Sequence, residues 1–352
     1  MRSDSPSEAI SETIADTISV ALCTYNGARF LEEQLASLQA QERCPDELVV
    51  CDDRSTDKTV PLLEAFARAA SFPVRIHVNP VNLGSTMNFD RAMRLCAGNL
   101  IAFCDQDDVW HSTRLSACAG AFRDDPRLGL VFSNGELIDE MGTPLPGRLS
   151  DKFTFGPAIR ERIHHGDMLP LIRYRFVTGA TVMFRAHLRE YICPAAGEWL
   201  HDGWIAACAS CLANIGFLDE PLIQYRIHPQ QQVGTGPGQR QKPFSELARE
   251  HWLGSDWHRR ETGLLLDCVR RIPAPLRTVA ADDFEQQHAF LSMRITLPGR
   301  RWQRVSKIAP FRADYKRRAS GWKSMLLDFL LPKQHDETGS AESAHFSALR
   351  SR

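Results

Sequence analysis

Three carboxylates lie close together in the segment Asp105-Gln106-Asp107-Asp108. They follow Leu100–Cys104, a run of apolar or small residues that predicts a strand buried on both faces. So much like charge is too costly for a core, and alternate residues of an extended segment point the same way. Asp105 and Asp107 are therefore predicted to share one divalent cation at a rim. Oxygen ligands suit Mg²⁺ or Mn²⁺ held together with substrate phosphates, and a solvated acidic turn is the alternative.

Three more predicted strands precede this segment, at 18–23, 47–51 and 74–78. Helical patterns separate the strands, at 29–39, from Ser55 onward, and at 88–97. This alternation predicts a doubly wound α/β sheet. Because the carboxyl ends of its strands meet at one edge, we expect the polar loops that follow them to lie together. These loops are Thr24-Tyr25-Asn26, Asp52-Asp53-Arg54-Ser55, Asn82-Leu83-Gly84 and Asp105–Asp108.

Composition excludes several classes. The chain has 352 residues and a formal net charge of −1, which predicts no nucleic-acid partner. No apolar run reaches the roughly 18 residues of a membrane span, and the acidic start differs from a signal peptide, so we expect a cytoplasmic protein. The ten cysteines are expected to be mostly small core residues. Cys208 and Cys211 have the C-x-x-C spacing, but no second pair and no nearby His ligand set favours a zinc or redox site there. The glycine motifs of dinucleotide and P-loop proteins are absent.

Four motifs in order now define a resemblance: Val20–Asn26, Val49–Asp57, Asn82–Gly84 and Asp105–Trp110. Together they resemble the nucleotide-sugar-binding half of the family 2 glycosyltransferases with the GT-A fold. Asn88-Phe89 and the Asp105–Trp110 variant are most similar to the bacterial rhamnosyltransferase-like branch, which builds O-antigen and capsule. The similarity continues to about residue 235, roughly two-thirds of the chain.

The resemblance implies an α/β fold of GT-A type, Rossmann-like, with a mostly parallel sheet flanked by helices and an additional α-helical C-terminal region. It also implies an inverting enzyme that uses a nucleoside diphosphate sugar, a glycan or lipid-linked acceptor, and Mg²⁺ or Mn²⁺. The metal residues would be Asp105, Asp107 and His228. The residues implied to bind substrate are Thr24, Tyr25, Asn26, Asp53, Ser55, Asn82, Gly84, Asn88, Asp105, Gln106, Trp110, Gly179, Trp204 and Arg226.

Inverting transfer needs one carboxylate to take the proton from the acceptor hydroxyl. In the family this base is the Asp of a pair ahead of a helix, which Asp202 matches, with His201 as a supporting residue and a helix expected at 205–212. A helix-capping role is the alternative for Asp202. Arg226 would offset charge on the leaving group. Asn88-Phe89-Asp90 stands where many members have Ala-Arg-Asn, which leaves the nucleobase open.

Four segments are expected: a disordered tail at 1–16, a catalytic domain at 17–238, a basic helical region at 239–333 and a flexible tail at 334–352. The second segment should contain a strand at 176–184, and the third should contain helices at 244–257 and 262–272. Within the third, residues 300–323 carry nine Lys or Arg against one acid, Asp314, with Trp302, Ile308, Phe311, Tyr315 and Trp322 interleaved. This segment could lie on the inner face of the cell membrane, or pack its aromatic face on the catalytic domain. Two other functions remain open: a nucleotidyltransferase, and a non-catalytic sugar-nucleotide or glycan-binding protein.

Overall fold

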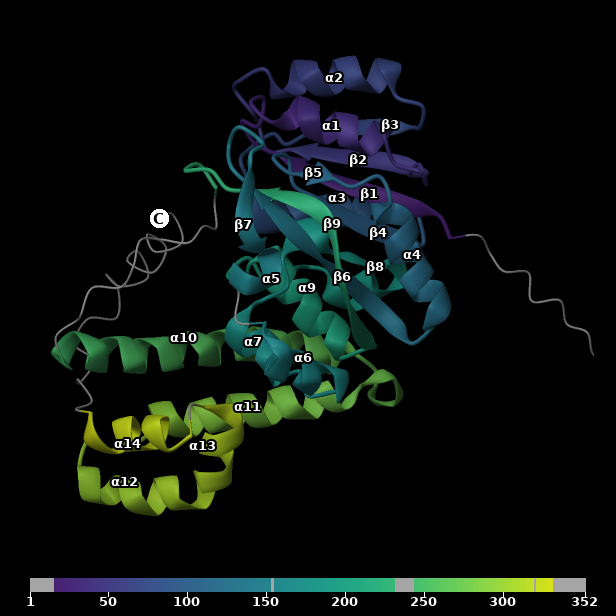
Figure 1. Ribbon diagram of the computed structural model, residues 1–352. Coiled ribbons are helices and arrows are strands. Elements are labelled where there is room, and N and C mark those ends of the chain that lie inside the picture. Colours follow the sequence, from purple (N-terminus) through teal and green to yellow (C-terminus); the bar gives the residue numbers. More distant parts are fainter. Residues whose placement is uncertain (1–15, 153–154, 232–243, 320, 332–352) are drawn as a thin grey trace, which may run out of the picture.

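The computed structural model describes residues 16–152, 155–231, 244–319 and 321–331. The predicted tails at 1–16 and 334–352 therefore lie outside the described residues, except for residue 16. The described chain forms one nine-stranded sheet covered by helices on both faces, with further helices at the C-terminal end (Figure 1). The α/β prediction is confirmed.

The first half alternates strands and helices as the sequence predicts. Its strands are β1 (Ile18–Thr24), β2 (Glu47–Asp52), β3 (Val74–Val78) and β4 (Leu100–Cys104). They pair in parallel in the order β3-β2-β1-β4. The helices between and after them are α1 (Leu31–Gln39), α2 (Thr59–Ala69), α3 (Ser85–Leu95) and, beyond the short β5 (Val109–Trp110), α4 (Arg114–Asp124).

The second half extends the sheet by mixed pairing. The strands β8 (Met183–Arg185) and β6 (Leu128–Ile138) add antiparallel neighbours, and β9 (Asn214–Arg226) pairs in parallel with β6. The strand β7 (Pro144–Arg148) forms a side branch on β6. Short helices lie between these strands: α5 (Leu149–Lys152), α6 (Pro157–His164), α7 (Leu169–Tyr174), η1 (Gly179–Thr181), η2 (Ala186–Leu188), α8 (Arg189–Ile192) and α9 (His201–Ser210). Most paired positions of the sheet remain parallel.

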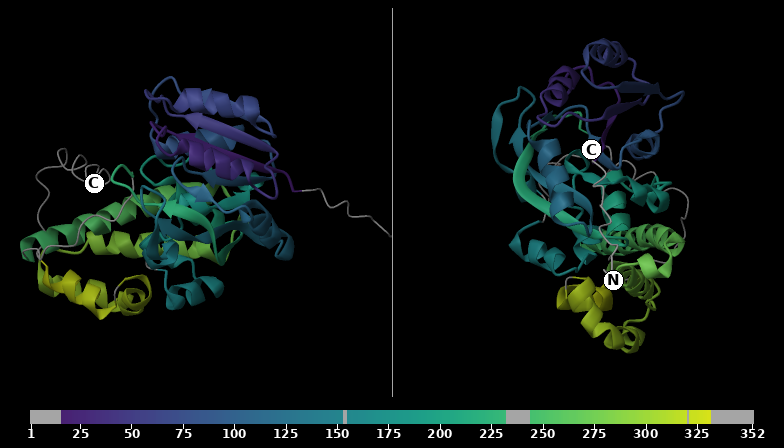
Figure 2. Two further views of the ribbon diagram at one scale, coloured as in Figure 1. Left: turned by 45° about the horizontal axis from the view of Figure 1, so that its top comes forward. Right: turned by 90° about the vertical axis from the view of Figure 1, so that its right-hand side faces the viewer.

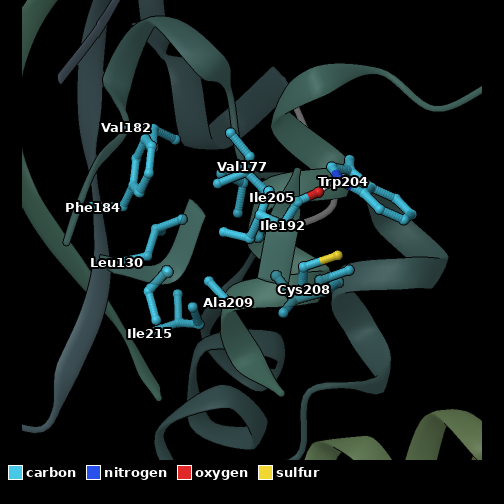
Figure 3. Packing of buried hydrophobic residues seen from close by; sticks show 14 of the residues in the cluster. Leu130, Val177, Val182, Phe184, Ile192, Trp204, Ile205, Cys208, Ala209 and Ile215 are labelled. Carbon is cyan, nitrogen blue, oxygen red and sulfur yellow. Dashed lines mark hydrogen bonds between the residues drawn. The ribbon is translucent and has the colours of Figure 1, made fainter. Parts of the chain in front are cut away.

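Two apolar layers hold the sheet between helices, because alternate residues of a strand face opposite sides. On β1, Val20 and Leu22 join the layer under α1 and α4, whereas Ala21 and Cys23 join the layer under α3 and α9. Figure 3 shows part of the second layer, where Ile205 and Cys208 of α9 pack among residues of the sheet and its loops. All ten cysteines are free, and Cys208 and Cys211 are buried in this layer, as expected.

The C-terminal helices divide into two groups. The long helix α10 (Phe244–Arg271), joined through η3 (Ala274–Leu276) to α11 (Val279–Ile295), contributes to the same core as the sheet, through residues such as Leu265, Val269 and Phe284. The second group has a small core of its own and lies at the outer end of the molecule, away from the sheet (Figure 2). It consists of α12 (Arg301–Ile308), η4 (Ala309–Phe311), α13 (Arg312–Arg318) and α14 (Trp322–Leu330).

Three element predictions need correction. Residues 176–184 do not form one strand, because the chain turns through η1 before the short β8 begins. The helix expected at 205–212 begins earlier, at His201. The two helices expected at 244–257 and 262–272 are one continuous helix, α10. None of the helices in the described ranges is both long and apolar enough to cross a membrane.

Candidate active site

The loops that follow β1, β2 and β4 interlock at the carboxyl edge of the sheet. Gln106 holds the backbone of Tyr25 from both sides, accepting from its N–H at 2.8 Å and donating to its carbonyl at 3.1 Å. Asn26 has a positive φ of 49°, and its Oδ1 accepts from the Thr56 N–H at 2.8 Å while its own N–H donates to Ser55 Oγ. The predicted convergence of these loops is therefore present. Tyr25 remains 45% exposed, so its ring is free to meet a ligand.

Several predicted substrate residues are instead occupied in shaping these loops. Asp53 is buried, and its carboxylate accepts from the backbone N–H groups of Leu83 and Gly84. Thr24 is also buried and donates its hydroxyl to Asp52, and Asn88 is buried with its amide on the Cys51 carbonyl. These three side chains hold the loops and the strand ends in place, which corrects their assignment to direct contact.

Two other predicted residues also help to hold the second and third loops. Ser55 donates its hydroxyl to the carboxylate of Asp52, and Asn82 donates its amide to the Asp53 carbonyl at 3.3 Å. Gly84 has a φ of +78°, a left-handed conformation that glycine adopts at no steric cost. It precedes α3 directly, so the sharp turn there brings the loop back over Asp53.

The acidic segment after β4 carries more negative than positive charge. Asp108 is buried, with Oδ1 accepting from the Arg226 N–H and Oδ2 lacking a partner among the described residues. Burial, together with the nearby charges of Asp107 and Asp202, raises the pKa of Asp105 to about 8. Arg114 opposes this effect, but it is one buried guanidinium against several carboxylates.

His228 lies next to Asp107, as expected of two residues that bind the same metal ion. Its Nε2 lies 2.8 Å from Asp107 Oδ2, and its ring packs against Phe30 with centroids 4.8 Å apart. The side chain of His228 is only 6% exposed. Asp107 and His228 thus come together from segments more than a hundred residues apart.

Arg226 is placed differently from the expectation that it neutralises a leaving group. Its side chain is fully buried, with Nε on the Asp107 carbonyl at 2.8 Å and Nη2 on Glu33 Oε2 at 2.6 Å. Its Nη1 lies 3.3 Å from the Asp139 carbonyl. Arg226 therefore anchors the acidic loop to α1 and to the end of β6, and contact with a diphosphate is not supported.

The residues at this corner fit a divalent cation only in part. Within the ranges that the structure describes, no group of three or more His, Cys, Asp or Glu is arranged to hold a metal ion. Asp107 and His228 do present an oxygen and a nitrogen to each other, and the unpartnered Asp108 Oδ2 lies in the same loop. Mg²⁺ and Mn²⁺ commonly use one or two protein ligands and complete their shell with phosphates and water. The donor set therefore fits a cation shared with a diphosphate.

Asp202 lies in the first turn of α9, and its charge raises the pKa of Asp105 in the acidic segment. The helix begins at His201, and its N-cap position is Leu200, which has no side-chain cap. Asp202 Oδ1 accepts from the Gly203 N–H in the same turn at 2.6 Å, and Oδ2 accepts from the Gly179 N–H at 3.3 Å, across a gap of 23 residues. The carboxylate therefore satisfies an N–H group at the start of α9, as the helix-capping alternative expects, and η1 positions it as well.

His201 lies behind Asp202 as a packed supporting residue. Its ring stacks on Phe89 with centroids 4.0 Å apart, and burial lowers its pKa, which keeps it neutral near pH 7. Gly179 allows this arrangement, because a Cβ at that position would lie 2.3 Å from His201 Nε2. The close approach of backbone and ring explains the glycine.

Both tryptophans predicted to bind substrate are core residues. Trp110 is 4% exposed, and the Arg114 guanidinium lies 3.6 Å from the centroid of its ring. Trp204 is 2% exposed and donates its indole N–H to the Ile192 carbonyl at 2.9 Å. In Figure 3 Trp204 lies beside Ile192 in the packed layer. Their assignment to the substrate site is corrected.

Two residues of the site were missed by sequence reasoning. Arg114 places a buried cation behind the acidic segment, and Glu33 pairs with Arg226. The only signal for Arg114 is its place on the apolar face of a helix, beside Leu115 and Cys118. An arginine at such a position needs a buried partner. No such signal marks Glu33 in the sequence. Its side chain is 59% exposed, and a glutamate on the exposed side of a helix is ordinary.

Comparison with known proteins finds similar glycosyltransferases. The model of the family described as glycosyl transferase family 2 matches residues 19–185. The dTDP-rhamnosyl transferase RfbG of Shigella flexneri is 36% identical over 262 residues, which cover 68% of this chain and 81% of RfbG. An uncharacterized glycosyltransferase of Nostoc sp. is 26% identical over 220 residues, 60% of this chain and 65% of that protein. The structure of S. aureus TarS 1–349 in complex with UDP-GlcNAc has a TM-score of 0.49 at 18% identity, with 89% of each chain covered.

These matches establish the class of protein. The chain belongs to glycosyltransferase family 2, and it is a glycosyltransferase. The family match covers β1 to β8, and so includes the interlocked loops and the acidic segment.

Proposed function

We propose that this glycosyltransferase is inverting and metal-dependent, and that it moves a sugar from a nucleoside diphosphate sugar to a growing cell-surface polysaccharide or lipid-linked glycan. One observation carries the proposal: Asp202 is brought from the start of α9 to within electrostatic range of Asp105, at the edge where the polar loops converge. A proton acceptor and the predicted donor site are thus close enough to serve one reaction.

The donor is proposed to lie over the interlocked loops. The exposed ring of Tyr25 can stack on the nucleobase, and Gln106 fixes the backbone that carries it. For the sugar we propose rhamnose on a dTDP carrier, because the relative that shares 36% identity over most of its length is a dTDP-rhamnosyl transferase.

Asp107 and His228 would hold Mg²⁺ or Mn²⁺ together with the phosphates of the donor, with Asp105 in the same acidic segment. The cation would neutralise charge on the departing diphosphate. The other contributions to the reaction come from groups of the protein. Arg226 keeps the acidic segment in place from behind, and Arg114 offsets part of its charge. Asp202 Oδ2 accepts from the Gly179 N–H, and the first turn of α9 places the positive end of a helix beside this carboxylate. The carboxylate of Asp202 takes the proton from the acceptor hydroxyl.

The proposal also covers the domain organisation, the location of the protein and its acceptor. Residues 17–238 are assigned to catalysis and 239–333 to a helical region, in a protein of the cytoplasm. The acceptor is a glycan carried by a lipid at the inner face of the membrane, and residues 300–333 are the segment proposed to contact that surface.

Ligand-induced thermal stabilisation tests the donor. The protein is heated with dTDP-rhamnose, UDP-glucose and GDP-mannose, each with and without Mn²⁺. We expect the largest rise in Tm with dTDP-rhamnose and Mn²⁺, since a ligand stabilises the state that it binds. Asp107→Asn should keep the Tm of the free protein and lose the Mn²⁺-dependent part of the rise. A rise that is equal with and without Mn²⁺ would contradict metal dependence, and nucleotidyl transfer instead of sugar transfer would favour the rival enzyme.

A further inference from the structure

Two helices at the outer end of the molecule expose large apolar side chains that the other described residues leave uncovered. On α12 these are Trp302, 69% exposed, and Val305, 54% exposed. On α14 they are Trp322, 65% exposed, with Leu326 and Leu330 on the same helix face. Because α12 and α14 pack against each other, the two stripes lie on neighbouring helices. We call these five side chains the apolar face.

The apolar face is exposed although the two helices that carry it are firmly packed in the fold. Arg304 of α12 is fully buried and donates to the Asp328 and Leu331 carbonyls at the end of α14, at 2.8 and 2.7 Å. Ile308 and Tyr315 pack in a small core with Phe290 of α11. The interleaved aromatic residues of the sequence thus separate into two sets: some turn inward, while both tryptophans turn outward.

The charges around the apolar face are almost all positive. Exposed basic side chains surround it on both helices and on α13: Arg300, Arg301, Lys307, Arg312, Lys316 and Lys323. The two acids between residues 296 and 331, position 320 excepted, are engaged, because Asp314 pairs with Arg318 and Asp328 is buried on Arg294. A partner for this face must therefore be apolar at its centre and anionic around it.

We propose that α12 and α14 form the surface by which the protein docks on an anionic lipid bilayer. Tryptophan favours the boundary between lipid and water, and lysine and arginine beside it attract anionic head groups. The group of helices lies away from the sheet (Figure 2). This inference rests on the membrane contact proposed above for residues 300–333, and it does not depend on the transferred sugar or on the metal.

Vesicle co-sedimentation of the full chain tests the proposal. Vesicles of phosphatidylcholine alone are compared with vesicles in which about a third of the lipid is phosphatidylglycerol, at low and high salt. We expect binding to the anionic vesicles only, and weaker binding at high salt. Lys323→Gln should weaken it about fivefold, the factor for one basic residue near an anionic surface. Arg68→Gln, an exposed cation on α2, is the matched control and should bind like the wild type.

The aromatic part is tested by the double variant Trp302→Ala and Trp322→Ala. It should lose binding at least tenfold and keep the wild-type Tm, since both side chains are exposed. Leu276→Ala with Val279→Ala, exposed apolar residues at the other end of α11, is the control and should not change binding. Equal binding by the double tryptophan variant, or no binding of the wild type to anionic vesicles, would overturn the proposal. So would a wild-type dimer that the double variant converts to a monomer, because the face would then bind a second copy.

Discussion

Buried carboxylates occur at the catalytic edge and in the outer helical group, and the two regions compensate them in opposite ways. Asp328 of α14 is fully buried, and both of its oxygens accept from Arg294, with the Tyr315 hydroxyl as an additional donor. The acidic segment after β4 has several carboxylates and, among the described residues, one nearby buried guanidinium and no partner for one oxygen of Asp108. The carboxylate of Asp328 is neutralised by protein groups and stabilises the fold. The acidic segment after β4 has too few positive groups of its own, so a cationic ligand can bind there.

The largest effect is expected at the catalytic edge. Asp202→Asn should lower kcat by about 10²- to 10⁴-fold, because the amide cannot take the acceptor proton. Donor binding, measured by titration calorimetry, should stay near the wild-type value, since Asn keeps the oxygen that accepts from Gly179. Full transfer activity in this variant would remove Asp202 from the mechanism.

The comparison of the two buried carboxylates can be made directly by urea unfolding at pH 7. Asp328→Asn should destabilise the protein by about 3–5 kcal/mol, because it leaves Arg294 buried without its counter-charge. Asp108→Asn should change the free energy of unfolding by less than about 1 kcal/mol. Burial raises the pKa of Asp108 well above its ordinary value, so a neutral amide resembles the form that it replaces. Equal losses in the two variants would contradict the distinction.

A smaller loss is expected where η1 supports Asp202. Gly179→Ala places a methyl group against the stacked ring of His201 and should cost about 1–3 kcal/mol of stability, together with part of kcat. Gly156→Ala is the control, because nothing lies within 4 Å of its Cβ position. The two free energies of unfolding are compared at one pH, and a loss in the control alone would exclude the steric argument.

The smallest effect concerns pH. Burial lowers the pKa of His201 below its ordinary value near 6.5, and the Asp202 charge opposes this shift only in part. The unfolded chain therefore binds this proton first, so the stability from neutral His201 is present above about pH 6.5 and is lost as pH falls below it. His201→Gln should flatten the fall by up to about 1.4 kcal/mol per pH unit. Unfolding at pH 7 and pH 5 measures the difference, and an unchanged slope would contradict it.

The sequence was informative about the sheet because local patterns carry that information. The run Val74–Val78 agrees with β3 in both bounds, and Leu100–Cys104 agrees with β4. The run Phe176–Phe184 misled, because a short apolar stretch without periodicity fits a strand as well as a turn. The position of η1 depends on distant contacts with His201 and Asp202.

The sequence indicated which residues lie near the site better than it indicated what each side chain does there. Asp107 and His228 meet as expected, and the charge of Asp202 raises the pKa of Asp105 in the acidic segment. Trp110 and Arg226 turn inward, and the motif could not show this, since the direction of a side chain depends on which neighbour offers a partner. For Arg226 that neighbour is Glu33, almost two hundred residues away.

The shared core of the sheet and the helices α10 and α11 has a practical meaning. Leu265, Val269 and Phe284 close the same apolar layer that covers the inner face of β1. A gene fragment that stops at residue 238 would encode a polypeptide with one side of its interior open to water, and we expect it to be recovered from cells as insoluble material. For crystallisation, a fragment that ends near residue 296 and lacks only α12–α14 would be a better choice than one that ends at residue 238.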